Sequence, residues 1–318
     1  MNLTASDFYS YLRPGRCARR VYLRHIGAAE EPASPYDQVL ERLGQRHEAS
    51  HLSSFPEFTD LSKGRREERR EQTVAEVQRG AKVLYQPVLE ATEKLSGVDC
   101  RILGEPDFLI RNNGGYLVRD SKMSRRINQK DHPEILGQLT TYGWLYERTF
   151  GAPAVRLEVH SGTGEIVPVP YEPDSALQTL ATIAEIKGMN SEPYGAVGWS
   201  KCDDCGFRSH CWQIAEQNRT VDLIYGVDQS LATALHGDGV DTIDDLLERF
   251  DAESLAEYKR PWGTRMQRVG KQANQILVMV EALRSGQHIV LQRLAVPDRP
   301  NYVMFDLEGL PPQLDELD

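Results

Sequence analysis

The chain has 318 residues, of which 40% are hydrophobic and 26% are charged, and its formal net charge is −10 at pH 7. These values predict a globular protein with at least two units and exclude one coated in basic surface. The first residues lack the apolar core of a signal peptide, and no run approaches the ~20 apolar residues that span a bilayer. We therefore expect a cytoplasmic protein with no membrane partner.

The N-terminal quarter of the chain has a mainly helical pattern. Residues 1–27 predict a helix, a turn and a second helix, with a break at Pro14 just before Cys17. From about residue 38 to residue 96 the pattern again predicts helix. The stretch KGRREERREQ within it is best interpreted as a solvated helix surface, because acidic residues interrupt the basic ones that a DNA contact would need.

A hairpin follows in the sequence RILGEPDFLIRNNGGYLVRDSK. The pair Asn113-Gly114 stands between two strand-like runs, which is the strongest short-range hairpin signal. With these two residues as the turn, counting outward places Asp107 opposite Asp120, and Glu105 opposite Lys122. Because directly opposed residues share a face, three carboxylates and one ammonium group are expected to converge.

This convergence predicts a divalent-cation site. Two aspartates so close repel each other, and Mg²⁺ or Mn²⁺ would relieve the repulsion while promoting hydrolysis of a phosphodiester, with Lys122 offsetting charge in the transition state. Pro106 cannot donate to a strand ladder, so the position of Glu105 is less firmly predicted than that of Asp107. An ordinary surface hairpin with polar residues on one face remains an alternative when this segment is considered alone.

Four further elements follow the hairpin. A helix is predicted from about residue 133 to 150, and on it Gln138 and Tyr142 share one face because they are four residues apart. A β-like segment, VRLEVHSGTGEIVPVPY, comes next, followed by helical sequence over 174–187. After about Arg219 the chain changes to short helices separated by glycine, which marks a domain boundary.

These motifs, in this order, resemble the PD-(D/E)xK superfamily and specifically its RecB-like branch. The matching residues form the patterns G-x-x-H at Gly44–His47, G-x-x-D at Gly104–Asp107, D-x-K at Asp120–Lys122 and Q-x-x-x-Y at Gln138–Tyr142. The resemblance implies that His47, Asp107 and Asp120 bind the catalytic metal and that Lys122 is catalytic. It also implies that Gln138 and Tyr142 face the DNA.

Four of the five cysteines form a one-plus-three pattern, in which Cys17 is followed much later by Cys202, Cys205 and Cys211. In a reducing compartment such a set indicates a metal or iron-sulfur site rather than disulfides, and the uneven spacing favours iron and sulfur. It resembles the [4Fe-4S] nucleases of the same branch, including CRISPR-associated exonucleases and AddB-type nucleases. A zinc site made by the same thiolates is the alternative, and Cys100 is expected to be a buried thiol.

The C-terminal third shows weaker resemblances. Residues 219–285 resemble a helix-hairpin-helix unit, whose backbone N–H groups would bind phosphates, although a plain helical spacer has the same local signals. The stretch KRPWGTRMQRVGKQANQ is locally basic and strengthens the DNA interpretation. Near the end, Asp306 and Glu308 in NYVMFDLEG resemble the first strand of an RNase H-like domain, but the residues after Glu308 are too few to build one.

Together these observations predict an α/β protein with a restriction-endonuclease-like core, a mixed sheet flanked by helices, and a small all-α C-terminal module. The expected domains are a nuclease domain over 1–218, a DNA-binding module over 219–285, and a linker with a truncated RNase H-like start over 286–318. The expected activity is Mg²⁺- or Mn²⁺-dependent DNA cleavage, exonucleolytic on single strands, in repair, recombination or foreign-DNA processing. The alternative is a non-catalytic iron-sulfur or zinc scaffold that binds nucleic acid.

Overall fold

The computed structural model of the chain describes residues 1–13, 15–199, 201–263 and 265–291, and beyond these the single residues 298, 301, 303 and 305. The described residues form two compact units. Unit 1 contains residues 1–28 and 33–194, and unit 2 contains residues 29–32 together with the described residues from 195 onward. Asp306 and Glu308, the expected start of an RNase H-like domain, lie outside the described residues.

Unit 1 contains two sheets in the part of the chain that the structure describes. The larger has six strands in the order β2-β3-β6-β7-β8-β9, and the smaller has three in the order β1-β5-β4. The larger is a mixed sheet, because β2 and β3 are parallel, as are β7 and β8, whereas its other neighbours are antiparallel. The strands are β1 (Asn2–Thr4), β2 (Thr59–Asp60), β3 (Val83–Tyr85), β4 (Leu89–Leu95), β5 (Val98–Gly104), β6 (Phe108–Asn112), β7 (Gly115–Ser121), β8 (Leu157–His160) and β9 (Ile166–Val169).

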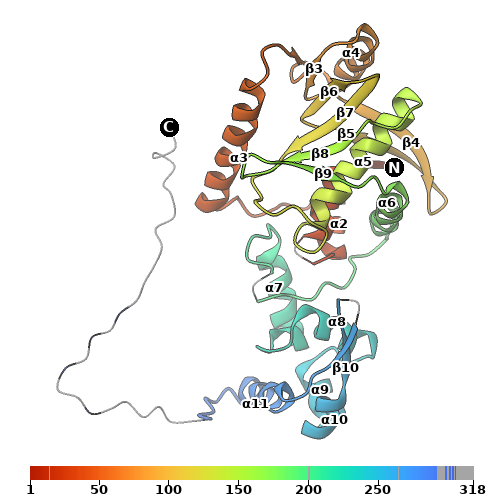
Figure 1. The fold of residues 1–318 in the computed structure, drawn as a ribbon. Helices are drawn as coiled ribbons and strands as arrows, with labels where there is room; N and C mark the ends of the chain where they lie inside the picture. The colour runs from red at the N-terminus through yellow and green to blue at the C-terminus, as the bar shows by residue number, and fades with distance from the viewer. Residues whose placement is uncertain are drawn as a thin grey trace. The chain divides into compact units, whose positions relative to one another are not determined.

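Helices cover both faces of the larger sheet. The helices of unit 1 are α1 (Ser6–Leu12), α2 (Ala18–His25), α3 (Pro35–Ser53), α4 (Arg66–Arg79), α5 (Pro133–Phe150) and α6 (Pro173–Lys187). Helix α5 packs against strands of both sheets, and its buried Leu139 and Leu145 belong to the main core (Figure 1). On the other face, His51 of α3 contacts Arg119 of β7, whose side chain points away from that of Asp120. Strand β7 therefore lies between α5 and α3.

The local signals of unit 1 explain most of these elements. Ser34 caps α3 in a capping box with Asp37, and α5 begins with Pro133 in its first turn and ends at Gly151 in the left-handed conformation. The predicted helix over 133–150, the β-like segment and the helix over 174–187 are confirmed as α5, β8–β9 and α6. The mixed α/β fold with a restriction-endonuclease-like core is thus the observed fold class.

The prediction of helix throughout residues 38–96 was wrong. Only α3 and α4 are helical there, and the chain then forms β3 and β4. The signal for strands was present, because Pro87 lies between the apolar runs Val83–Tyr85 and Val88–Leu89, and proline does not fit a helix interior. The charged residues that flank these runs gave the segment its helical appearance.

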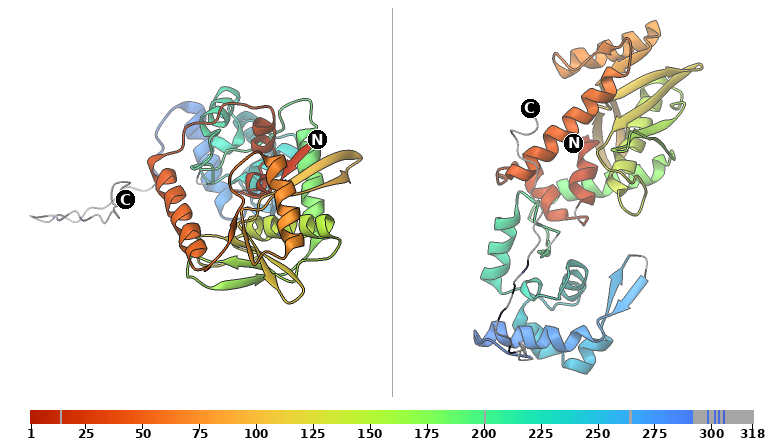
Figure 2. Two further views of the ribbon diagram at one scale, coloured as in Figure 1. Left: turned by 90° about the horizontal axis from the view of Figure 1, so that it is seen from above. Right: turned by 60° about the vertical axis from the view of Figure 1, so that its left-hand side comes forward.

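Unit 2 is mainly helical. Its elements are α7 (Arg208–Asn218), the short 3₁₀ helix η1 (Val221–Leu223), α8 (Gln229–Gly237), α9 (Ile243–Arg249), α10 (Ala252–Glu257), β10 (Lys259–Trp262), β11 (Arg265–Arg268) and α11 (Gln272–Ser285). Thr242 caps α9 in a capping box, as its sequence indicates. The antiparallel pair β10–β11 is an addition to the all-helical module that was expected (Figure 2).

A short N-terminal segment, residues 29–32, packs in unit 2 although the chain on either side of it belongs to unit 1. The backbone N–H of Glu31 donates to the carbonyl of Gly206 at 2.7 Å, and the Glu31 carboxylate accepts from the backbone N–H of Ser209 at 2.7 Å. The second bond, with Arg208 nearby, lowers the pKa of Glu31. Across both units, no described helix is long and apolar enough to cross a bilayer.

Candidate active site

The site begins with the β6–β7 hairpin, whose predicted register is confirmed. Asn112 pairs with Gly115, and Phe108 pairs with Arg119. Asn113 and Gly114 have φ values of 24° and 93°, and a two-residue turn with both φ values positive is the one that matches the twist of a hairpin. Asp107 directly precedes the paired part of β6, and Asp120 lies near the end of β7.

Three of the predicted catalytic residues meet at the open end of this hairpin. The backbone N–H of Ser121 donates to Oδ2 of Asp107 at 2.6 Å, and the backbone N–H of Asp107 lies 3.4 Å from Oδ1 of Asp120. Lys122 completes the group, because its Nζ lies 2.6 Å from Oδ2 of the buried Asp120. Two carboxylates and one ammonium group therefore converge as the alternation of the strands predicted.

Electrostatics in this group favour a bound cation. Burial and the charge of Asp120 hold the pKa of Asp107 well above its ordinary range, although Lys122 acts in the opposite direction. For Lys122, burial lowers the pKa, but the negative charges of Asp120 and Asp107 together raise it by more. The net shift of the Lys122 pKa is therefore upward. The amine therefore remains protonated at neutral pH, and one positive charge faces two carboxylates.

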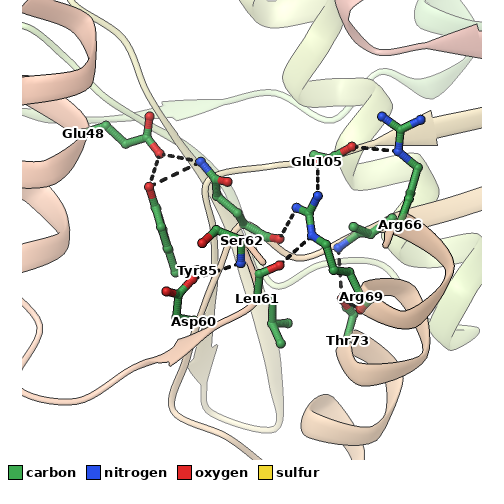
Figure 3. Close-up of polar contacts among 11 residues, drawn as sticks. Glu48, Asp60, Leu61, Ser62, Arg66, Arg69, Thr73, Tyr85 and Glu105 are labelled. Carbon is green, nitrogen blue, oxygen red and sulfur yellow. Dashed lines mark hydrogen bonds and ion pairs between the residues drawn. The ribbon is translucent and has the colours of Figure 1, made fainter. Parts of the chain in front are cut away.

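Glu48 of α3 is a third carboxylate near the aspartate pair. Its negative charge contributes to the raised pKa values of both Asp107 and Lys122. The hydroxyl of Tyr85 donates to Oε1 of Glu48 at 2.7 Å, and Nε2 of Gln86 donates to the same oxygen at 3.0 Å (Figure 3). Sequence reasoning missed Glu48, because it directly follows His47 and nothing in the helical pattern separates it from other exposed acids.

Gln86 connects Glu48 to the aspartates. Its backbone N–H donates to the carbonyl of Asp107 at 2.7 Å, while its side chain holds Glu48. Its φ is 49°, in the left-handed region that residues other than glycine rarely adopt. A strained residue of this kind persists where its surroundings hold it, and such positions cluster at functional sites.

Glu105 does not join the aspartates, so its expected position was wrong. Its carboxylate forms ion pairs with two arginines of α4, Arg66 at 3.1 Å and Arg69 at 2.8 Å (Figure 3). The β6–β7 ladder ends at Phe108, because Pro106 interrupts the strand and the alternation of side chains cannot be extended past it. The third carboxylate beside the aspartate pair is Glu48 instead.

Arg69 joins the segments that carry these acids. It is buried, and its guanidinium donates to the carbonyl oxygen of Leu61 at 2.5 Å and to that of Gln86 at 3.0 Å, in addition to its ion pair with Glu105 (Figure 3). Arg69 thus fixes two parts of the chain: Gln86, whose side chain holds Glu48, and the segment around Glu105 that leads to Asp107. Sequence reasoning missed this role because the charged stretch was interpreted as solvent-facing.

Gln138 and Tyr142 lie together on α5. Nε2 of Gln138 donates to the Tyr142 hydroxyl at 2.9 Å, as their spacing indicated. Tyr142 is 4% exposed, and burial, followed by the charges of Asp120 and Asp107, raises its pKa well above the ordinary value. The ring therefore lies close to the carboxylates, and Gln138 is the more accessible of the two residues.

His47 contacts the last residue of β8, His160. Its Nε2 lies 3.2 Å from the carbonyl of His160, which also accepts from the backbone N–H of Lys122 at 2.9 Å. A carbonyl can only accept, so Nε2 of His47 carries the proton and, in the neutral ring, Nδ1 keeps a lone pair. The rings of His47 and His51 both stack on that of His160, with centroid distances of 4.5 Å and 3.9 Å.

The cysteines are placed at element ends. Cys17 is the N-cap of α2, and its Sγ accepts from the backbone N–H of Arg20 at 3.5 Å. In unit 2, Sγ of Cys202 accepts from the backbone N–H of Gly198 at 3.3 Å. Cys205 lies in the loop that follows Cys202, and Cys211 lies in the first turn of α7. Cys100 is fully buried in the core of unit 1, as expected.

Among the described residues, no three histidine, cysteine, aspartate or glutamate side chains stand in a ready-made metal-binding arrangement. In the aspartate group, the Lys122 ammonium and the Ser121 N–H occupy carboxylate oxygens that a cation would use. Binding of a divalent ion there would therefore displace or share these two donors.

Comparison with known proteins gives one family match. Residues 15–212 match the profile of the PD-(D/E)XK nuclease superfamily. This matched range includes every residue of the candidate active site. No curated protein matches the chain. The solved structures include one titled "Crystal structure of SSO0001", which is 16% identical, has a TM-score of 0.37, and covers 66% of this chain and 85% of that one.

Proposed function

Because the chain belongs to the PD-(D/E)XK nuclease superfamily, which implies a phosphodiester-hydrolysing nuclease, we propose that it is a metal-dependent DNA nuclease of the RecB-like branch. We further propose that it acts exonucleolytically on single-stranded DNA in the cytoplasm, in repair, recombination or foreign-DNA processing. The observation that carries this proposal is the convergence of Asp107, Asp120 and Lys122 at the end of the hairpin.

The residues present fit a divalent cation with oxygen preference. Asp107 and Asp120 hold two carboxylates close together in a partly buried position. The pKa of Asp107 is raised because the positive charge of Lys122 does not fully offset its burial and the negative charge of Asp120, and a bound cation would add the missing positive charge. In this proposal both aspartates hold Mg²⁺ or Mn²⁺, with Nδ1 of His47 as a further ligand. When bound, such an ion activates water and polarises the scissile phosphate.

Lys122 acts as a fixed positive charge in this proposal. In the metal-free protein the charges of Asp120 and Asp107 raise its pKa, so the ammonium group is protonated at neutral pH. From its position beside Asp120 it would orient the attacking water and offset the negative charge that develops on the phosphate oxygens. Substrate binding is assigned to Gln138 and Tyr142, with the Gln138 amide reaching the DNA and the buried tyrosine orienting that amide.

Glu48 adds an acceptor that the chain itself provides. Tyr85 and Gln86 hold its carboxylate in place, and its charge reaches Asp107 and Lys122. A carboxylate held close enough for its charge to act on Asp107 can accept a hydrogen bond from water near the aspartate pair. Glu48→Gln is therefore expected to lower the rate of cleavage while the fold remains intact.

The four cysteines Cys17, Cys202, Cys205 and Cys211 are proposed to hold a [4Fe-4S] cluster with a structural role. The donor set supports it, because Cys17 and Cys202 each accept a backbone N–H···S hydrogen bond, and such bonds stabilise thiolate ligands. With four thiolates, the cluster would be fully ligated. The functional domains that we propose are the nuclease domain over 1–218, the DNA-binding module over 219–285 and the segment over 286–318.

The decisive experiment compares wild type with Lys122→Ala in cleavage of end-labelled single- and double-stranded DNA, with Mg²⁺, with Mn²⁺ and with EDTA. We expect metal-dependent cleavage by wild type and a loss of at least ~10²-fold in the variant. Equal activity in both proteins would reject the assignment of Lys122. No cleavage by either protein would favour a non-catalytic scaffold that binds nucleic acid.

Anaerobic purification tests the cysteine site separately. A brown protein with visible absorption, lost on Cys205→Ser, is the expected result for an iron-sulfur cluster. Colourless protein with stoichiometric zinc would replace the cluster by a zinc site, and Cys100→Ser should leave either result unchanged because that thiol lies in the core of unit 1.

A further inference from the structure

The β10–β11 hairpin of unit 2 presents an exposed tryptophan. Trp262 is 57% exposed and pairs with Arg265 in the register of the two strands, so these two side chains share a face. In the described chain the two strands pair only with each other, and they extend away from α10 and α11 (Figure 2). One exposed aromatic side chain does not by itself mark a binding surface, so the groups around the indole decide its role.

The base of this hairpin is held rigidly. Arg260 is buried, and its Nη2 forms an ion pair with Oδ2 of Asp228 at 2.7 Å. The hydroxyl of Ser230 donates to the carbonyl of Pro261, and the backbone N–H of Val269 donates to the carbonyl of Tyr258 at 3.0 Å. These bonds anchor both strands at the base of the hairpin and fix the backbone directly before Trp262.

Arg260 also orients the indole of Trp262. Its Cζ lies 4.6 Å from the ring centroid, and within the described structure its buried Nη1 has no hydrogen-bond acceptor. The guanidinium therefore rests on the ring in a cation–π contact, which limits the rotamers of the tryptophan. The exposed indole is preorganised, so binding a planar group would require little further ordering.

One unpaired cation, Arg265, lies beside the indole, and two more lie at the base of the hairpin. Lys259, Arg265 and Lys271 are exposed, and none of them has an ion-pair partner among the residues that the structure describes. This local excess contrasts with the net charge of −10 of the whole chain. An apolar protein partner would need a continuous apolar patch, whereas a single indole beside an unpaired cation is complementary to a polyanion that carries planar groups.

We propose that the β10–β11 hairpin is a binding element for single-stranded nucleic acid, in which one base stacks on Trp262 while Arg265, which shares its face, contacts a neighbouring phosphate. The inference rests on the proposed function in so far as the strand is the substrate of the nuclease. A duplex would not satisfy the site, because its bases are already stacked on each other and only its phosphates are available.

Binding is measured in EDTA, so that no cleavage can occur, by fluorescence anisotropy of a labelled oligothymidylate of roughly 20 nucleotides, which exceeds the ~4–16-nucleotide footprint of common single-strand modules. Trp262→Ala should weaken binding by about tenfold or more, whereas Trp262→Phe, which keeps a ring, should lose much less. Arg265→Ala should reduce the slope of log K against log salt concentration by about 0.7, the share of one phosphate contact on a single strand.

Tyr36→Ala, which removes another exposed aromatic side chain, is the matched control and should bind as wild type does. Equal affinity of wild type and Trp262→Ala for the oligothymidylate would overturn the proposal, as would an equal loss of affinity for a blunt duplex. An oligouridylate of the same length shows whether the base-stacking site takes RNA as well as DNA. A tenfold loss of affinity in Trp262→Ala, for either the oligothymidylate or the oligouridylate, supports the site. If wild type fails to cleave DNA while Trp262→Ala still loses affinity, the nuclease assignment fails and the binding element stands.

Discussion

A Cβ atom added to Gly104 would lie 2.6 Å from Cδ1 of Tyr142, a separation that real Cβ atoms do not show. Gly104 ends β5 and begins the segment that carries Asp107, and Tyr142 is buried in α5 beside the carboxylates. The glycine of the G-x-x-D pattern is therefore required by packing: it lets the ring lie directly against the strand.

Gly104→Ala should destabilise the protein by about 1–3 kcal/mol, because the new methyl group overpacks the contact with Tyr142. Gly44→Ala is the matched control, since Gly44 lies within α3 and a Cβ there would meet nothing within 4 Å. That control should be more stable than wild type by about 0.5–1 kcal/mol, the difference in helix propensity. Urea unfolding measures both, and the packing explanation is excluded if the two substitutions shift stability in the same direction.

Arg69→Met should cost about 3–5 kcal/mol, because it removes a buried cation that binds Glu105 and two carbonyl oxygens. The matched control is Arg66→Met, which removes the more exposed arginine from the same Glu105 and should cost less than about 1 kcal/mol. Thermal unfolding gives the stabilities. A similar small cost for both arginines would show that Arg69 does not hold the Gln86 and Glu105 segments together.

Substitution at the aspartate pair should separate repulsion from metal binding. Since burial and Asp120 disfavour the charged form of Asp107, Asp107→Asn should stabilise the metal-free protein at neutral pH by on the order of 1 kcal/mol. Mn²⁺ at a hundred times its Kd should stabilise wild type by about 2.7 kcal/mol and this variant far less. Asp99→Asn, at an exposed position in β5, should respond to Mn²⁺ as wild type does, and an unchanged response of Asp107→Asn would remove Asp107 from the metal ligands.

His51 should make the protein acid-sensitive. Burial, with smaller effects from His160, Arg119 and His47, lowers the pKa of His51 from 6.5 to about 4. The unfolded chain therefore binds a proton more readily than the folded one, so stability is complete above about pH 6.5 and falls as the pH falls towards 4. Between pH 7 and pH 5 this single group accounts for about 2 kcal/mol.

Urea unfolding at pH 7 and pH 5 checks this pH dependence. In His51→Leu the loss of stability between the two values should shrink by about that amount, whereas His25→Ala, at an exposed position, should retain the wild-type loss. If His51→Leu and wild type lose the same free energy on acidification, the acid sensitivity originates elsewhere.

The parts of the site that sequence could predict are those fixed by local geometry. Asn113-Gly114 determines the hairpin turn, the turn determines the register, and the register brings Asp120 to Asp107. Helical spacing likewise joins Gln138 to Tyr142. In each case the relevant residues are near in sequence or linked by a regular ladder.

The parts that sequence could not predict depend on long-range packing or on a break in regularity. Glu48 reaches the aspartates only because α3 packs beside the strand that ends at Tyr85, and no periodicity records that contact. Glu105 turns to α4 because Pro106 ends the alternation. Arg69 looked like one charge among many in an exposed helix, and only the fold shows that it is buried.

The chain crosses between the two units more than once, because residues 29–32 pack in unit 2 and the chain then returns to unit 1 until residue 194. A fragment that starts at Gly195 would therefore lack the segment that hydrogen-bonds to Gly206 and Ser209, within the loop and helix start between Cys205 and Cys211. Dissection of this protein into separately expressed halves consequently requires either a peptide spanning Ala29–Pro32 supplied in trans or a permuted chain that keeps this segment joined to the C-terminal half.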